Sequence, residues 1–135
     1  MILKYCNRFY DRQFYTRANL NKDLITKFEQ VMQQYYQTGK ASERGVLTVK
    51  YCANALAMSS NYLGDLIKTE TGRTAKDHIQ DYIIEKAKTK IIGTNQSISE
   101  IAYDFGFEYP QSFNKLFKSK TGLTPTEYRN DPKIL

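Results

Sequence analysis

The sequence of 135 residues predicts an all-α protein. Three observations support this fold class: capping residues stand at regular places, apolar residues recur at helical spacing, and one block of sequence occurs twice. No stretch of four or more residues alternates between apolar and polar in the manner of a strand bounded by turns. We expect seven helices, over residues 21–38, 48–56, 60–71, 74–92, 97–105, 110–121 and 124–130.

Capping residues define the expected helix boundaries. Ser97 and Glu100 have the spacing of a capping box, in which both side chains bind free amides of the first turn. Thr124 and Glu127 repeat this spacing, with Pro125 at the first helical position, where proline is favoured. The other expected N-caps are Asn21, Thr48, Thr74 and either Ser59 or Ser60. Glycine adopts the left-handed conformation most easily, so the expected helix ends are Gly39, Gly72, Gly93 and Gly122.

Apolar periodicity supports the two longest helices. Leu24, Phe28 and Val31 form one stripe within residues 21–38. Within residues 74–92, an isoleucine or an alanine recurs at every fourth position from Ile79 to Ile91. This spacing places the apolar side chains on one helix face, which we expect to be buried.

One block of the sequence occurs twice. Residues 63–72 (LGDLIKTETG) align with residues 113–122 (FNKLFKSKTG) at an offset of 50. Upstream the offset is 49, which pairs Ala53 with Ala102 and Ala57 with Gly106. One residue is therefore inserted around residues 108–110, where a turn is expected and an insertion is tolerated.

Each copy has the pattern of a helix-turn-helix: a short helix, a tight turn, and a second helix with apolar residues at i, i+3 and i+4. Ala53 or Ala102 is small enough to let the two helices cross closely, and Ala57 or Gly106 begins the turn. A helical solenoid is the alternative, but solenoids normally need more than two repeats. We expect the first unit over about 47–72, a linker helix over about 74–92, and the second unit over about 97–122.

The second unit resembles the DNA-binding domain of the AraC/XylS family of bacterial transcription regulators. The residues that carry this resemblance are Ile101-Ala102, Gly106-Phe107, Phe113, Phe117, Gly122 and Pro125-Thr-Glu-Tyr128-Arg129. The resemblance extends over residues 47–129. It implies that the second helix of each unit, about 60–71 and 110–121, enters a major groove of double-stranded DNA. A linker of 19 residues would be about 28 Å long at 1.5 Å per residue, close to the roughly 34 Å between successive grooves.

The outward faces of these two helices supply the candidate contact residues. We expect Leu63, Leu66 and Ile67 to be buried in the first helix, and Phe113, Leu116 and Phe117 in the second. Glutamine can bridge adenine, lysine can donate to guanine, and aspartate can accept from cytosine. The expected base-reading residues are Gln111, Ser112, Asn114, Lys115, Asn61 and Asp65. The family resemblance adds Gly64 and Pro110, although neither offers a polar side chain. The expected phosphate contacts are Lys68, Arg73, Lys118, Lys120, Tyr62 and the backbone amide of Ile98.

Charge is consistent with this interpretation but is not specific by itself. The net charge is +6 and the isoelectric point is about 9.2, values shared by many ordinary domains. The distribution is more informative, because residues 106–122 hold three lysines against Glu108, whereas residues 93–105 hold Glu100 and Asp104 and no base.

Other function classes lack the residues they require. Cys6 and Cys52 are far apart and no secretion signal precedes them, so we expect no disulfide. His78 has no second histidine or CxxC motif, so we expect no metal and no cofactor. No nucleophile–base pair or glycine-rich phosphate loop suggests an enzyme. No run approaches the roughly 18 apolar residues of a membrane span, so we expect a cytoplasmic protein.

Residues 1–20 differ from the rest, with five aromatic and four basic residues but no complete core pattern. We expect them to be the tail of an upstream sensor domain that is absent from this chain, with a frayed linker as the alternative. Besides DNA, RNA polymerase is an expected partner, and we expect a monomer or a weak dimer. The alternative function is a helical protein-interaction or dimerisation module, whose affinity would not respond to duplex DNA.

Overall fold

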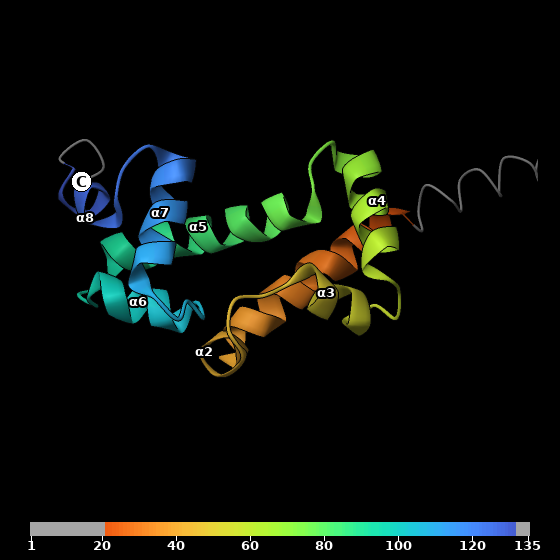
Figure 1. Ribbon diagram of the computed structural model, residues 1–135, viewed down its shortest axis with the longest axis horizontal. Coiled ribbons are helices and arrows are strands. Elements are labelled where there is room, and N and C mark those ends of the chain that lie inside the picture. Colours follow the sequence, from red (N-terminus) through yellow and green to blue (C-terminus); the bar gives the residue numbers. More distant parts are fainter. Residues whose placement is uncertain (1–20, 132–135) are drawn as a thin grey trace, which may run out of the picture.

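The structure, a computed structural model, describes residues 21–131, and its regular elements in this range are all helices (Figure 1). The all-α prediction is therefore confirmed. The expected tail at residues 1–20 lies outside the described residues. A helix over residues 21–37 comes first. It is followed by α2 (Lys40–Arg44), α3 (Val49–Ala55), α4 (Ser60–Thr71), α5 (Ala75–Gly93), α6 (Ile98–Asp104), α7 (Pro110–Thr121) and α8 (Pro125–Asn130).

Five of the six expected N-caps form where the sequence suggested, whereas Asn21 is itself a helical residue. The hydroxyls of five residues each accept a hydrogen bond from the backbone N–H three positions later, which satisfies one free amide of the first turn. These residues are Thr48, Ser59, Thr74, Ser97 and Thr124. The helix α4 begins and ends at the expected residues, with Ser59 rather than Ser60 as its cap. The helix α7 also has the expected bounds, although it starts at Pro110 without a side-chain cap.

Two local expectations were wrong. The short helix α2 was not expected, because five residues are too few to show a periodic pattern. Gly93 does not end α5 in a left-handed conformation; it is the last helical residue, and Thr94 follows in an extended conformation with φ of −133°. The Thr94 hydroxyl donates to the Lys90 carbonyl at 2.6 Å, so the threonine closes this helix end without a glycine.

The helices form two lobes joined by α5. The first lobe comprises residues 21–37, α3 and α4, and the second comprises α6, α7 and α8 (Figure 1). The helix α5 packs against helices of both lobes, and its apolar stripe is buried as expected. The most buried residues of this stripe are Ile79, Ile83, Ala87 and Ile91.

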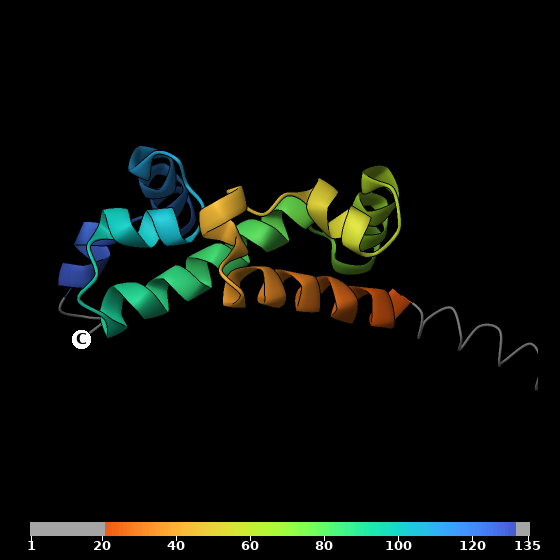
Figure 2. The same ribbon diagram turned by 90° about the horizontal axis from the view of Figure 1, so that it is seen from below.

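The helices α4 and α7 lie on the same side of the molecule. In Figure 2, α4 in yellow-green and α7 in blue occupy one side, whereas residues 21–37 and the carboxyl-terminal end of α5 lie on the other. In Figure 1 the two helices also run in the same general direction. The fold therefore presents two similar helices to one face, at opposite ends of α5.

A chain of aromatic rings connects the cores of the two lobes. Neighbouring rings have centroids between 4.9 and 6.4 Å apart, within the range in which aromatic pairs attract each other. The members in order are Tyr51, Tyr35, Tyr36, Phe105, Phe113, Phe117 and Tyr128. The lobes thus share one apolar core.

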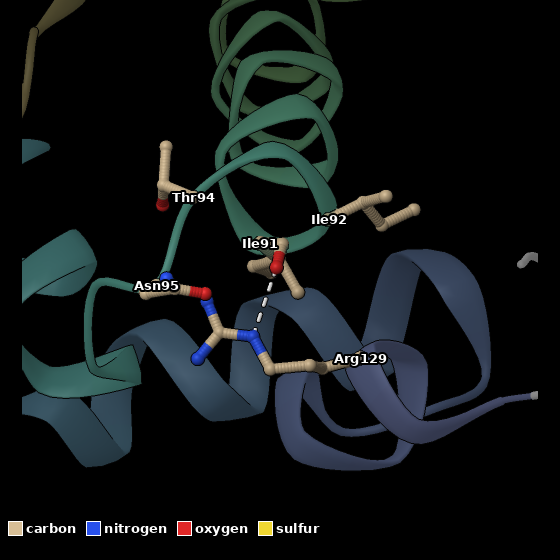
Figure 3. A pocket seen from close by; sticks show the side chains of 5 residues that line it. All are labelled: Ile91, Ile92, Thr94, Asn95 and Arg129. Carbon is tan, nitrogen blue, oxygen red and sulfur yellow. Dashed lines mark hydrogen bonds between the residues drawn. The ribbon is translucent and has the colours of Figure 1, made fainter.

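The far end of α5 is held by the last helix. Arg129 Nε donates to the Ile91 carbonyl at 2.8 Å, in a pocket also lined by Ile92, Thr94 and Asn95 (Figure 3). A cationic side chain at the carboxyl end of a helix is favourable, because the terminal carbonyls carry partial negative charge. This contact fixes the second lobe against the end of the linker helix.

Candidate nucleic-acid interface

The two repeats have the same turn geometry. In the first, the Met58 N–H donates to the Ala53 carbonyl at 2.9 Å; in the second, the Phe107 N–H donates to the Ala102 carbonyl at 3.0 Å. Both alanines are buried, with exposed fractions of 1% and 0%. The helices of each unit therefore cross closely over a small side chain, as the sequence pattern predicted.

Each second helix has one buried face and one exposed face. Leu63 and Ile67 are buried in α4, and Phe113 and Phe117 are buried at the equivalent positions of α7. Leu66 and Leu116 are half-buried rather than fully buried. The opposite faces carry the candidate contact residues, and the two helices lie on a common side of the molecule.

The exposed face of α7 is polar and positively charged. Gln111, Ser112 and Lys115 are exposed in its first half, and Lys118 is exposed in its second half. Pro110 is the first residue of the helix, as expected, and brings no polar group. The helix contains three lysines and no acidic residue. Such a face can donate hydrogen bonds to guanine and adenine edges and attract phosphates.

Asn114 is less outward than the sequence suggested. It is half-buried, and its Oδ1 atom is buried without a hydrogen-bond partner among the described residues. Gly64, its equivalent in α4, is also half-buried. This helix position is half-buried in both units, so only part of the Asn114 amide is available to a ligand.

The exposed face of α4 has a different character. Asn61, Asp65 and Lys68 are exposed, and Tyr62 is 57% exposed. The single lysine of this helix is opposed by Asp65 and Glu70. The face therefore offers hydrogen-bonding groups and an aromatic ring, but no net positive charge.

Two of the expected phosphate-contact residues have carboxylate partners. The Nζ atom of Lys120 lies 3.2 Å from Asp81 Oδ1 and 3.8 Å from Asp77 Oδ1. Arg73 pairs with the other oxygen of Asp81. Burial opposes ionisation of Asp81, but hydrogen bonds from Arg73 and Lys120 outweigh it and hold the pKa of this carboxyl below its usual range.

The sequence pattern did not single out Asp77 and Asp81 as partners of these cations. Their spacing of four residues could have indicated a shared helix face. The partners, however, come from the α4–α5 loop and from α7, and only the tertiary arrangement brings them together.

Ile98, whose backbone amide was the remaining candidate, is half-buried as the first residue of α6. Within residues 21–131, no cluster of three histidine, cysteine or acidic residues is arranged to hold a metal ion. In the same range, no helix combines the length and apolar character needed to cross a membrane.

A family model described as "Helix-turn-helix domain" matches residues 52–131. The uncharacterised transcriptional regulatory protein YesN of Bacillus subtilis is 40% identical over 86 residues, which cover 62% of this chain and 23% of that protein. This chain spans less than half the length of the curated relatives compared with it.

Two solved structures have the same fold. The C-terminal domain of the two-component response regulator yesN from Fusobacterium nucleatum has a TM-score of 0.64 at 27% identity, covering 76% of this chain and 97% of that one. The DNA-binding domain of AdpA, solved in complex with a target DNA, has a TM-score of 0.65 at 18% identity, covering 78% of this chain and 88% of that one. With its repeated units, its exposed second helices and the family match over residues 52–131, this chain belongs to the AraC-type helix-turn-helix family of DNA-binding transcription regulators.

Proposed function

We propose that α4 and α7 enter successive major grooves on one face of a duplex and that this chain is the DNA-binding part of a longer regulator. The observation that carries this proposal is the exposure of both second helices on a common side, at the two ends of α5. The 19 residues of α5 span about 28 Å at 1.5 Å per residue. Successive grooves on one face are roughly 34 Å apart, so one chain can reach both without dimerising.

Base reading is assigned mainly to α7. Gln111, Ser112 and Lys115 are exposed in the half of the helix that would enter the groove first, and Asn114 contributes through the exposed part of its amide. In α4, Asn61 and Asp65 are the proposed readers, with Asp65 restricted to accepting from a cytosine amine. This division makes the second lobe the stronger source of sequence preference.

Phosphate contacts are assigned to the flanks of both helices. Lys68, Lys118 and the Tyr62 hydroxyl are exposed there, and the Ile98 amide lies at the start of α6. Lys120 and Arg73 are further proposed contacts, in which each cation would lie between a phosphate and the Asp81 carboxylate. Phosphate contacts set orientation and affinity, whereas base contacts set sequence preference.

For the whole regulator, we propose an upstream sensor domain preceding residue 21, action in the cytoplasm, and RNA polymerase as a further partner. For this chain, we propose a monomer or a weak dimer in solution. We assign no catalytic role to this chain. The sensor domain, the location and the RNA polymerase contact concern the complete protein. The relatives extend well beyond the region that they share with this chain.

The proposal is tested by selecting bound duplexes from a random library and footprinting the selected sequence. We expect two protected major-groove segments, one helical turn apart, on the same face of the duplex. If about six phosphates are neutralised, affinity should fall on the order of 10³-fold between 50 and 200 mM salt. Binding that selects no sequence, or that does not respond to salt, would instead support a protein-interaction module.

A further inference from the structure

The turn of the second helix-turn-helix touches a loop that precedes the first. A Cβ atom at Gly106 would lie only 2.3 Å from the carbonyl carbon of Gly45 and 2.6 Å from the amide nitrogen of Val46. The two backbones are therefore in direct contact, with no room for a side chain between them. Figures 1 and 2 both show α2, which leads into this loop, beside α6.

The internal repeat shows that the turn itself does not require this glycine. Ala57 occupies the equivalent position in the first unit and has a φ of 57°, whereas Gly106 has a φ of 91°. The turns that contain them make the same hydrogen bonds, and the exposed Ala57 shows that alanine is accommodated in a left-handed conformation there. Gly106 differs from Ala57 in its more positive φ and in its contact with Gly45.

The loop is itself held by the first lobe. The Tyr35 hydroxyl donates to the Gly45 carbonyl at 2.6 Å, and the Leu47 N–H donates to the Tyr36 hydroxyl at 3.3 Å. The Tyr36 ring packs against Phe105, the residue before Gly106, with centroids 5.6 Å apart. It also stacks on Tyr82 of α5 at 5.6 Å. Residues 39–47, which we call the clamp, are thus held by Tyr35 and Tyr36 of the first lobe and contact the second lobe at Gly106.

We propose that the clamp sets the separation and orientation of α4 and α7, with Gly45 and Gly106 as positioning residues. A connecting helix alone would permit bending and rotation between the lobes. The ring contact of Tyr36 with Phe105 already limits these motions, and the backbone contact of Gly45 with Gly106 is a further attachment that leaves less room for them. The consequence for DNA binding rests on the proposed function: a rigid pair of helices should discriminate strongly between half-site spacings.

The direct test measures the distance between the lobes without DNA. Thr69 and Ser119 are exposed at equivalent positions of α4 and α7, so each can be replaced by a spin-labelled cysteine. A Cys6→Ser background removes one native thiol, and Cys52, with 0% exposure, should not label. Double electron–electron resonance should give a narrow distance distribution for the parent protein. The distribution should shift or widen in the Gly106→Ala variant.

Gly122→Ala is the matched control. Gly122 has a φ of 82°, and a methyl group at this position would have no neighbouring atom within 4 Å. Its alanine variant therefore carries a similar backbone strain in the same lobe without the clash, and its distance distribution should remain that of the parent. Tyr35→Phe is a second test variant that loses the hydroxyl bond to Gly45 but keeps the ring. It should widen the distribution even if Gly106→Ala does not fold.

A second measurement asks whether rigidity matters for DNA. The parent protein should bind a duplex with the selected half-site spacing much more tightly than a duplex whose half-sites are one or two base pairs closer together or further apart. In Gly106→Ala and Tyr35→Phe, the ratio between the two affinities should fall toward one. An unchanged distance distribution in both folded variants would overturn the clamp, whether or not the chain binds DNA. A changed distribution in a chain that binds no DNA would retain the clamp and reject the proposed function.

Discussion

The ammonium group of Lys120, in the last turn of α7, lies 3.2 Å from the carboxylate of Asp81 in α5. The other oxygen of this carboxylate pairs with Arg73, which stands in the loop after α4. One acidic side chain of the linker helix therefore contacts residues that follow or end both recognition helices. The ion pairs are partly exposed, with 34% of the Asp81 side chain accessible, so their contribution is modest and depends on salt.

Asp81→Asn should lower the free energy of unfolding at neutral pH and should make that free energy less dependent on pH below 6. Burial opposes ionisation of Asp81, but hydrogen bonds from Arg73 and Lys120 lower its pKa in the folded state, so its contribution is present above the unfolded value of about 3.9. The contribution is lost as the pH falls through the lower folded value. Urea denaturation at pH 6, 5, 4 and 3 should therefore show the two proteins converging in acid. Asp65→Asn, at an exposed position of α4, serves as the control, and equal differences at every pH would contradict the assignment.

Lys115→Ala should change the sequence preference of DNA binding, whereas Lys118→Ala should change its overall affinity. Lys115 is exposed in the reading half of α7, so its loss should relax the preference at one base pair by about 1–3 kcal/mol. Lys118 lies one turn later, toward the backbone, and its loss should weaken binding to all sequences alike. Competition titrations with single-base variants of the selected duplex separate the two outcomes. Identical profiles for the two variants would remove the distinction between reader and anchor.

Lys120→Ala should change the salt dependence of binding less than Lys118→Ala. A lysine that neutralises one phosphate contributes about 0.9 to the slope of log affinity against log salt. The Lys118→Ala variant should lose about this much of the slope, since no ion pair to Lys118 is found among the described residues. Lys120 already has two carboxylates nearby, so its contact with a phosphate should release fewer counterions from the DNA. Slopes measured between 50 and 200 mM salt test this order, and a larger effect of Lys120 would reverse our assignment.

Cys52 should be protected from thiol reagents in the folded protein. Its side chain is fully buried in α3, and burial raises the pKa of the thiol to about 12. Only the thiolate reacts, so modification should require unfolding and be at least about 10³-fold slower than in urea. The measurement uses a Cys6→Ser background, with Ser119→Cys as the exposed control. Fast reaction of Cys52 in the native state would show that α3 opens without global unfolding.

Much of the fold followed from local patterns in the sequence. The caps of α3 to α6 and of α8 are hydroxyl side chains that bind amides three residues away, an interaction complete within one helical turn. The buried faces of α4 and α7 followed from apolar spacing, and the repeat was enough to define the two units. For the same reason, Gln111, Ser112 and Lys115 could be placed on an outward face.

The expectations that failed have two causes. Two are local: the five residues of α2 are too few to show a periodic pattern, and Thr94 rather than Gly93 closes the end of α5. The carboxylate partners of Lys120, in contrast, belong to α5 and are distant in the sequence, so no fixed spacing indicates them.

The sequence alone determined the helices other than α2, the two repeated units and the chemical character of their second helices, because each of these depends on contacts within a few residues. The tertiary structure decided which side both faces share, which cations are already paired, and that Gly106 must be a glycine because Gly45 packs against it. These features arise from contacts between segments that fold together only when the two lobes have formed one core.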